Sequence, residues 1–247
     1  MKKLFVLLFL FISLSMQSQV LITLLLGDKL NSDGLEFGLE GGINLTKIDG
    51  LETSRLAGKW NLGFYFDIRL KKQWFLYTGV LVKSNFGVDL LTYNDLNKMG
   101  ATIYYTDDEE TIKAEGDYSQ KINAFMVPIL AKYKFKNNMY VELGPQLSLM
   151  YRSWVQFDSE IEDREAIIKE YNKDDINRID AGIMVGAGFT LFKGTGWTFG
   201  AKYYYGFTDV YKNISGTNNS SIYFKVNIPV GAGKAKEKRE KEKQLND

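Results

Sequence analysis

The sequence lacks the residue types on which most enzymatic chemistry depends. Its 247 residues include no histidine and no cysteine. This excludes Cys/His zinc sites, disulfides and the Ser-His-Asp and Cys-His nucleophile pairs. Lys and Arg number 31 against 30 Asp and Glu, which leaves no net basic field for a nucleic acid. We therefore predict no enzymatic activity, no cofactor and no nucleic-acid partner.

One run of side chains carries metal-ligand chemistry: Asp107, Asp108, Glu109 and Glu110. Carboxylate oxygens are the ligands that Ca²⁺ prefers. The four residues are consecutive, however, and lack the alternating spacing of a calcium loop. We interpret the run as a solvated acidic loop, with a calcium site as the weaker alternative.

Other charged residues alternate with apolar ones. In 125–135 and 139–147 every second residue is apolar, whereas Lys132, Lys134 and Glu142 fall on the opposite face. This period of two predicts strands, and the intervening Lys136-Asn137-Asn138 predicts a hairpin turn.

The same pattern recurs along the chain and predicts eight strands. They cover 35–45, 60–70, 74–85, 125–135, 139–147, 179–191, 197–207 and 222–230. Short and long connections alternate. The long ones include 87–120, 153–177 and 213–220, and Glu160 to Tyr171 is a candidate short helix.

An even number of strands, with short turns at one end and long loops at the other, is typical of an outer-membrane barrel. We predict an all-β fold, an eight-stranded antiparallel up-and-down transmembrane β-barrel. Aromatic residues near both ends of the apolar stripe would form the two membrane-interface girdles. They are Trp60, Trp74, Tyr133, Phe135, Tyr151, Trp197, Tyr205 and Phe207.

In such a barrel the polar stripe faces the interior. The predicted interior charge network comprises Glu36, Glu40, Asp67, Glu142 and Asp180 with Arg69, Lys83, Lys132, Lys134, Arg152, Lys202 and Lys225. Eight strands enclose only enough room for side chains, and buried charges are tolerated when paired. The sequence thus favours a packed, non-conducting interior over an ion pathway.

The sequence at the N-terminus predicts export, and the sequence at the C-terminus predicts a charged tail. Residues 1–18 combine a basic start with a short apolar run, typical of a cleaved signal peptide. We expect an N-terminal periplasmic segment at 19–34, the barrel at 35–230 and a charged periplasmic tail at 231–247. Val20 to Leu26 has no clear period, and whether it adds a strand is open. The tail is interpreted as solvated, with docking on a periplasmic partner as the alternative.

Several segments resemble the PorT-like family of small outer-membrane β-barrels, also described as porin-like. They are Phe37 to Leu45, Val127 to Phe135, Leu143-Gly144-Pro145, Gly186-Ala187-Gly188 and Tyr204 to Phe207. The namesake of that family is an accessory of a protein-secretion system, and the family has no catalytic residues to carry over. One departure is the last strand, which ends Ile228-Pro229-Val230 where such barrels usually end on an aromatic residue.

The combined prediction is a non-enzymatic protein of a Gram-negative outer membrane. It would contact membrane lipid and act as a structural or accessory component of an envelope complex, with a secretion complex as the example that the resemblance implies. Two alternatives remain: a narrow porin-like barrel that passes small solutes, and a soluble secreted ligand-binding barrel.

Overall fold

The computed structural model describes residues 34–103, 116–161, 164–191 and 196–230. The predicted signal peptide, most of segment 19–34 with Val20 to Leu26, the acidic run Asp107 to Glu110 and the tail at 231–247 lie outside the described residues. Within the described part, no helix is both long enough and apolar enough to cross a membrane.

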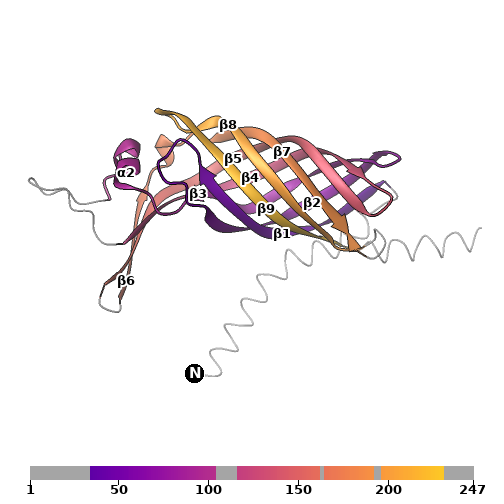
Figure 1. The fold of residues 1–247 in the computed structure, drawn as a ribbon, viewed down its shortest axis with the longest axis horizontal. Helices are drawn as coiled ribbons and strands as arrows, with labels where there is room; N and C mark the ends of the chain where they lie inside the picture. The colour runs from indigo at the N-terminus through magenta and orange to yellow at the C-terminus, as the bar shows by residue number, and fades with distance from the viewer. Residues whose placement is uncertain (1–33, 104–115, 162–163, 192–195, 231–247) are drawn as a thin grey trace, which may run out of the picture.

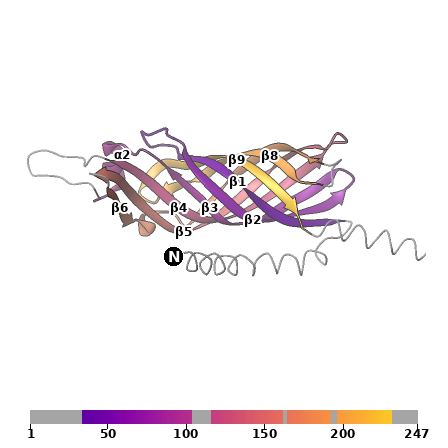
Figure 2. The ribbon, with the colours of Figure 1, turned by 90° about the horizontal axis from the view of Figure 1, so that it is seen from below.

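The fold is a ring of antiparallel strands (Figures 1 and 2). The strands are β1 (Leu35–Ile48), β2 (Ala57–Lys71), β3 (Trp74–Val88), β4 (Asp117–Lys134), β5 (Met139–Ile161), β6 (Arg164–Tyr171), β7 (Ile179–Thr190), β8 (Thr198–Tyr211) and β9 (Ile214–Pro229). Eight of them close the ring in the order β1-β2-β3-β4-β5-β7-β8-β9, because β4 pairs with β5 and β1 pairs with β9. The predicted eight-stranded up-and-down barrel is confirmed.

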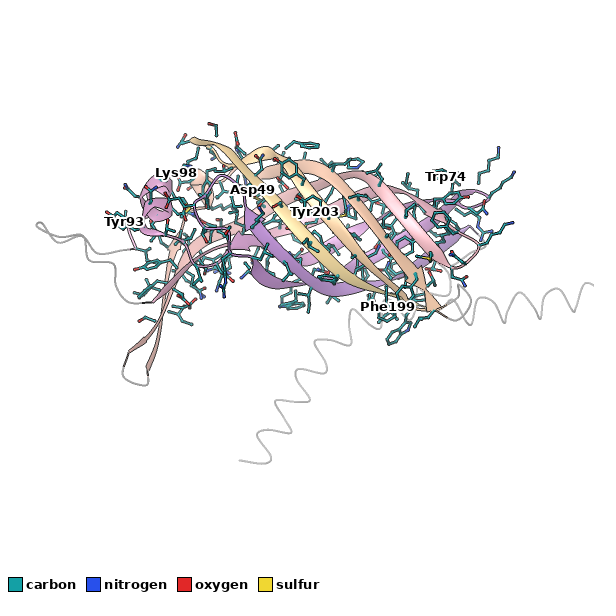
Figure 3. The ribbon with its side chains drawn as sticks, in the orientation of Figure 1. Asp49, Trp74, Tyr93, Lys98, Phe199 and Tyr203 are labelled. Carbon is teal, nitrogen blue, oxygen red and sulfur yellow. The ribbon has the colours of Figure 1, made fainter. Side chains whose placement is uncertain are left out.

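The ends of the barrel differ. At the short-turn end, tight connections join β2 to β3 and β4 to β5, and Lys72 and Asn138 adopt positive φ angles of 50° and 66° there. At the opposite, long-loop end lie the helix α2 (Tyr93–Met99), the 3-10 turn η1 (Lys173–Asp175) and β6. Figure 3 shows Trp74 and Phe199 toward the short-turn end and Tyr93 and Lys98 of α2 at the other.

The short helix predicted between Glu160 and Tyr171 is wrong. β5 continues beyond the ring, and β6 folds back along it in register from Trp154↔Tyr171 to Ile161↔Arg164. In Figure 1 this hairpin leaves the end of the barrel sideways. Pairing with the long β5 decides the conformation here, since segments with weak helix periodicity follow their tertiary context. Similarly, most of the predicted loop at 213–220 is the first part of β9.

The two faces of the barrel wall have inverted polarity. Apolar side chains point outward and are exposed, for example Leu143 at 55% and Phe224 at 53%. Neighbouring Glu142 and Lys225 point inward and are each 2% exposed. A soluble barrel buries its apolar stripe, whereas a membrane barrel presents that stripe to lipid. The inversion therefore identifies a transmembrane barrel and opposes the soluble alternative.

Glycines on the inner face make room for large side chains. A Cβ atom built on Gly200 would lie 2.1 Å from the Tyr140 hydroxyl oxygen and at least 3.1 Å from every other neighbouring atom. By contrast, a Cβ on Gly58 would have no atom within 4 Å. The wall at Gly200 is thus shaped by the hydroxyl of one tyrosine.

We expect Gly200→Ala to destabilise the barrel by about 1–3 kcal/mol through overpacking. Gly58→Ala is the matched control and should remain close to wild type. Adding Tyr140→Phe to Gly200→Ala removes the clashing oxygen and should restore most of the loss. The free energy of unfolding in detergent, measured by urea titration, tests all three variants. A double variant no more stable than Gly200→Ala alone would contradict this explanation.

Candidate functional site

Three buried ion pairs cross the interior in the half of the barrel nearer the short turns. Lys132 lies 2.8 Å from Asp67, Lys202 lies 2.8 Å from Glu40, and Lys225 lies 2.8 Å from Glu142. All six side chains are at most 2% exposed. Charges this deeply buried are tolerated because each has a partner of opposite sign within hydrogen-bonding distance.

Two tyrosines tie the pairs together. The Nζ atoms of Lys225, Lys202 and Lys132 lie 3.9, 4.7 and 4.9 Å from the centre of the Tyr77 ring. Lys132 also lies 4.3 Å from the Tyr140 ring. In addition, the Tyr77 hydroxyl donates to Glu40 and accepts a hydrogen bond of 3.1 Å from Asn227. Cation–π contacts and these hydrogen bonds join the charges into one plug.

Four further predicted charges lie on either side of this plug. Toward the short turns, Lys134 also pairs with Asp67 at 2.8 Å, and Tyr65 donates to Glu36 at 2.8 Å. Arg69 is exposed at this rim, with its guanidinium 5.4 Å from the Phe75 ring. Farther along the interior, Asp180 accepts from Tyr204 at 2.5 Å and from Thr208 at 2.9 Å.

The long-loop end is filled by a cap built on α2. The Asp95 carboxylate accepts backbone N–H bonds from Glu52 at 2.6 Å and from Thr53 and Thr92 at 3.1 Å. It thereby fixes the β1–β2 loop to the helix. Apolar side chains buried around this end include Phe86, Val88, Leu91, Leu96, Phe157, Val210 and Tyr211. The interior is thus occupied by ion pairs at one end and by an apolar core at the other.

Two of the charges predicted for the interior are wrongly placed. Lys83 and Arg152 are exposed, and both point away from the interior. Lys83 follows a register shift in which Leu62 pairs with Lys83 but Gly63 pairs with Leu81. Arg152 follows a second shift, between Asn123↔Arg152 and Ala124↔Met150. An extra residue in a strand reverses the alternation of faces beyond it, which explains both errors.

The aromatic residues expected at the membrane interfaces lie on the outer wall. Trp60, Trp74 and Trp197 are about half exposed, at 49%, 50% and 49%. Exposed rings also come from Phe135, Tyr151, Tyr205 and Phe207, whereas Tyr133 is half-buried against Trp74 with ring centres 5.0 Å apart. Their assignment to interfacial girdles stays a prediction.

A polar cavity lies at the long-loop ends of β2, β3 and β4. Its volume is about 370 Å³, and its lining includes Arg55, Lys59, Ser119 and Lys121 with Asp89, Asp117 and Asp158. Lys59 pairs with Asp89 at 3.3 Å, while Lys121 is 3.9 Å from Asp158.

No cluster of acidic side chains in the described ranges has the arrangement of a metal site. Sequence reasoning assigned all six charges of the plug to the inner face but missed Tyr77 and Tyr140, although both lie on the polar stripes. It also missed Asp95 and the α2 cap, because the 87–120 connection was read as a loop.

Comparison with protein-family models agrees with this architecture. A family model described as "Outer membrane protein beta-barrel domain" matches residues 17–212. Among solved structures, Ail of Yersinia pestis is 8% identical, with 80% of this chain and 99% of that chain covered and a TM-score of 0.40. Neisserial surface protein A is 10% identical, with 79% and 99% covered and a TM-score of 0.40. OprG of Pseudomonas aeruginosa is 11% identical, with 79% and 93% covered and a TM-score of 0.35. A search of curated proteins found no match.

We expect Lys202→Met to destabilise the barrel by about 3–5 kcal/mol, because it leaves the Glu40 carboxylate buried without its ion-pair partner. The control is Lys47→Met, which removes a partly exposed ion pair with Asp49 (37% and 31% exposed). Such surface pairs contribute about 0–1 kcal/mol. Urea unfolding in detergent measures both changes. Equal losses in the two variants would contradict a structural role for the buried pair.

Proposed function

This chain belongs to the outer membrane protein beta-barrel domain family, and from that premise we propose that it is a non-enzymatic, non-conducting barrel. We propose that it serves as a structural or accessory component of an envelope complex. The PorT-like resemblance makes secretion machinery the first class of complex to test. Export through a cleaved signal peptide at 1–18, with the short turns and both chain ends in the periplasm, belongs to the same proposal.

The main support for the proposal is that side chains fill the interior of the barrel. Six charged side chains at most 2% exposed, together with Tyr77 and Tyr140, occupy the lumen across its width. A conducting pore instead needs a hydrated path between polar walls. Ion pairs of this kind hold the wall together from inside, and their carboxylates and amines are buried against one another, out of reach of a substrate.

A partner surface is supported by the β5–β6 hairpin. β6 pairs with β5 along one edge only, so its other edge has no strand beside it within the described ranges. Its Ile167, Ile168 and Tyr171 side chains are 55%, 52% and 58% exposed. An open strand edge with apolar side chains is the kind of surface to which another chain adds a strand.

For conduction, we expect the purified full chain to give no stepwise currents in a planar lipid bilayer. We expect an ion crossing the described barrel to have to separate these buried ion pairs, which is energetically costly. A large general porin in the same lipid serves as the positive control. Reproducible unitary currents that track the amount of this protein would overturn the non-conducting assignment and favour narrow transport.

For the partner, we expect tagged protein solubilised in mild detergent to recover a reproducible set of companions, identified by mass spectrometry. Ile167→Asp with Ile168→Asp should reduce that recovery about ten-fold or more, since charged residues disrupt apolar interface anchors. The matched control is Leu56→Asp, which charges another exposed apolar residue (42% exposed) in the β1–β2 connection. Unchanged recovery with the hairpin variant would remove the hairpin as the partner surface. Absence of any companion would remove the accessory role.

A further inference from the structure

Four cations form a group on the outer wall of the barrel. Lys83 and Arg152 are turned outward by the two register shifts, and Lys121 and Lys169 lie on the adjoining strands β4 and β6. We call these four residues the outer cation belt. Lys83 and Arg152 flank the same point of β4, because Ser84 pairs with Ala124 and Asn123 pairs with Arg152. With strands about 4.8 Å apart, their backbones are separated by about 10 Å.

The belt lies at a defined height along the barrel. Lys83 is nine residues beyond Trp74, the first residue of β3 at the short-turn end. About 9–11 residues of a tilted strand cross the hydrocarbon core of a membrane. Trp60 and Tyr151, exposed aromatic residues of the type that marks a membrane interface, lie beside the belt: the Trp60 ring packs against Lys83, and Tyr151 directly precedes Arg152 in β5. The belt is therefore level with lipid headgroups at the far interface.

Aromatic rings hold three of the cations against the wall. Lys83 Nζ is 4.2 Å from the Trp60 ring centre, and Lys169 Nζ is 5.8 Å from that of Trp154. The Arg152 guanidinium lies 5.3 Å from Trp154 and 5.2 Å from Tyr171, whose hydroxyl accepts its hydrogen bond of 2.6 Å. Among the described residues, none of these three cations forms an ion pair with a carboxylate. The aromatic rings hold these three cations in place, and their remaining N–H groups can donate to a ligand.

The fourth cation, Lys121, is weakly paired. Its nearest carboxylate, Asp158, is 3.9 Å away and already accepts hydrogen bonds of 2.6 and 2.9 Å from Gln156. Lys121 also lines the 370 Å³ cavity beside Ser119, whose buried hydroxyl has no partner within the described part of the chain. Asp89 and Asp117 line the same cavity, and Asp89 is already paired with Lys59 at 3.3 Å.

We propose that the outer cation belt binds the phosphate groups of a phosphorylated glycolipid in the outer leaflet. The ligand class follows from three features: cations with unused donors, an outward orientation and a height level with the headgroups. Lysine and arginine near an anionic membrane surface each contribute about 1 kcal/mol of binding, or roughly a five-fold change in affinity. Arginine adds a planar fork that can bind a phosphate through two hydrogen bonds. The placement in the outer leaflet rests on the proposed orientation, with short turns in the periplasm.

The test is direct binding to the purified full chain in neutral detergent, measured by native mass spectrometry. The probes are a diphosphorylated lipid A, the same lipid without phosphates, and inorganic phosphate as competitor. We expect wild type to prefer the phosphorylated lipid by at least about ten-fold, since several cations contribute. Lys83→Gln with Arg152→Gln should lose most of that preference. The control, Lys71→Gln with Lys136→Gln, removes the same charge from exposed positions at the short-turn end and should retain it.

Each other result overturns the proposal. Equal affinity for the two lipids would exclude phosphate recognition. An equal loss of preference in the control variant would show that the preference comes from the net charge of the protein and not from the belt. Complete displacement by inorganic phosphate at the lipid's own concentration would indicate a site for free phosphate. A gel-mobility shift on heating shows whether each variant is folded. Because lipid binding is measured on the purified protein in detergent, its outcome is independent of the partner-recovery and conduction tests of the proposed function.

Discussion

Closure of the strand ring is the constraint on which the rest of this structure depends. In hydrocarbon there is no water to satisfy backbone N–H and C=O groups, so each spanning strand needs a hydrogen-bonded neighbour on both sides. The β1–β9 pairing, from Gly38↔Pro229 to Ile48↔Asn219, supplies the last of these contacts. Once the ring is closed, alternate residues must face lipid or the interior. The interior, with room for side chains only, then receives the polar residues of the regular stretches of strand.

The interior shows how so many charges are accommodated in a narrow space. Small residues on one part of the wall complement large ones on another: Gly188 and Gly200 leave the space that Tyr140 fills. The tyrosine rings in turn provide faces for the lysines, so that each ammonium meets a carboxylate and a π system together. The charge pairing and the glycine content of the polar stripe are therefore two aspects of one packing solution.

Much of the fold follows from the period-2 pattern alone, including the eight strands of the ring and the polarity of each face. The inner positions of Glu40, Asp67, Lys132, Glu142, Lys202 and Lys225 were also predictable, since they lie on regular stretches of strand. The features that could not be predicted depend on contacts between segments far apart in the sequence. The register shifts near Lys83 and Arg152 arise from a neighbouring strand, and a single extra residue reverses the faces. The β5–β6 hairpin and the Asp95 contacts of α2 likewise depend on partners distant in sequence.

The pairing of the first strand with the last also affects how the protein is made. Gly38 meets Pro229, so the contact that completes the ring waits until nearly the whole chain has been synthesised. Contacts between such distant parts of a sequence form slowly, and an incomplete ring leaves apolar stripes and unpaired strand edges exposed to water. Productive folding is consequently post-translational. Until β9 is available, the unpaired strand edges and apolar stripes of the incomplete ring are the surfaces most prone to aggregation.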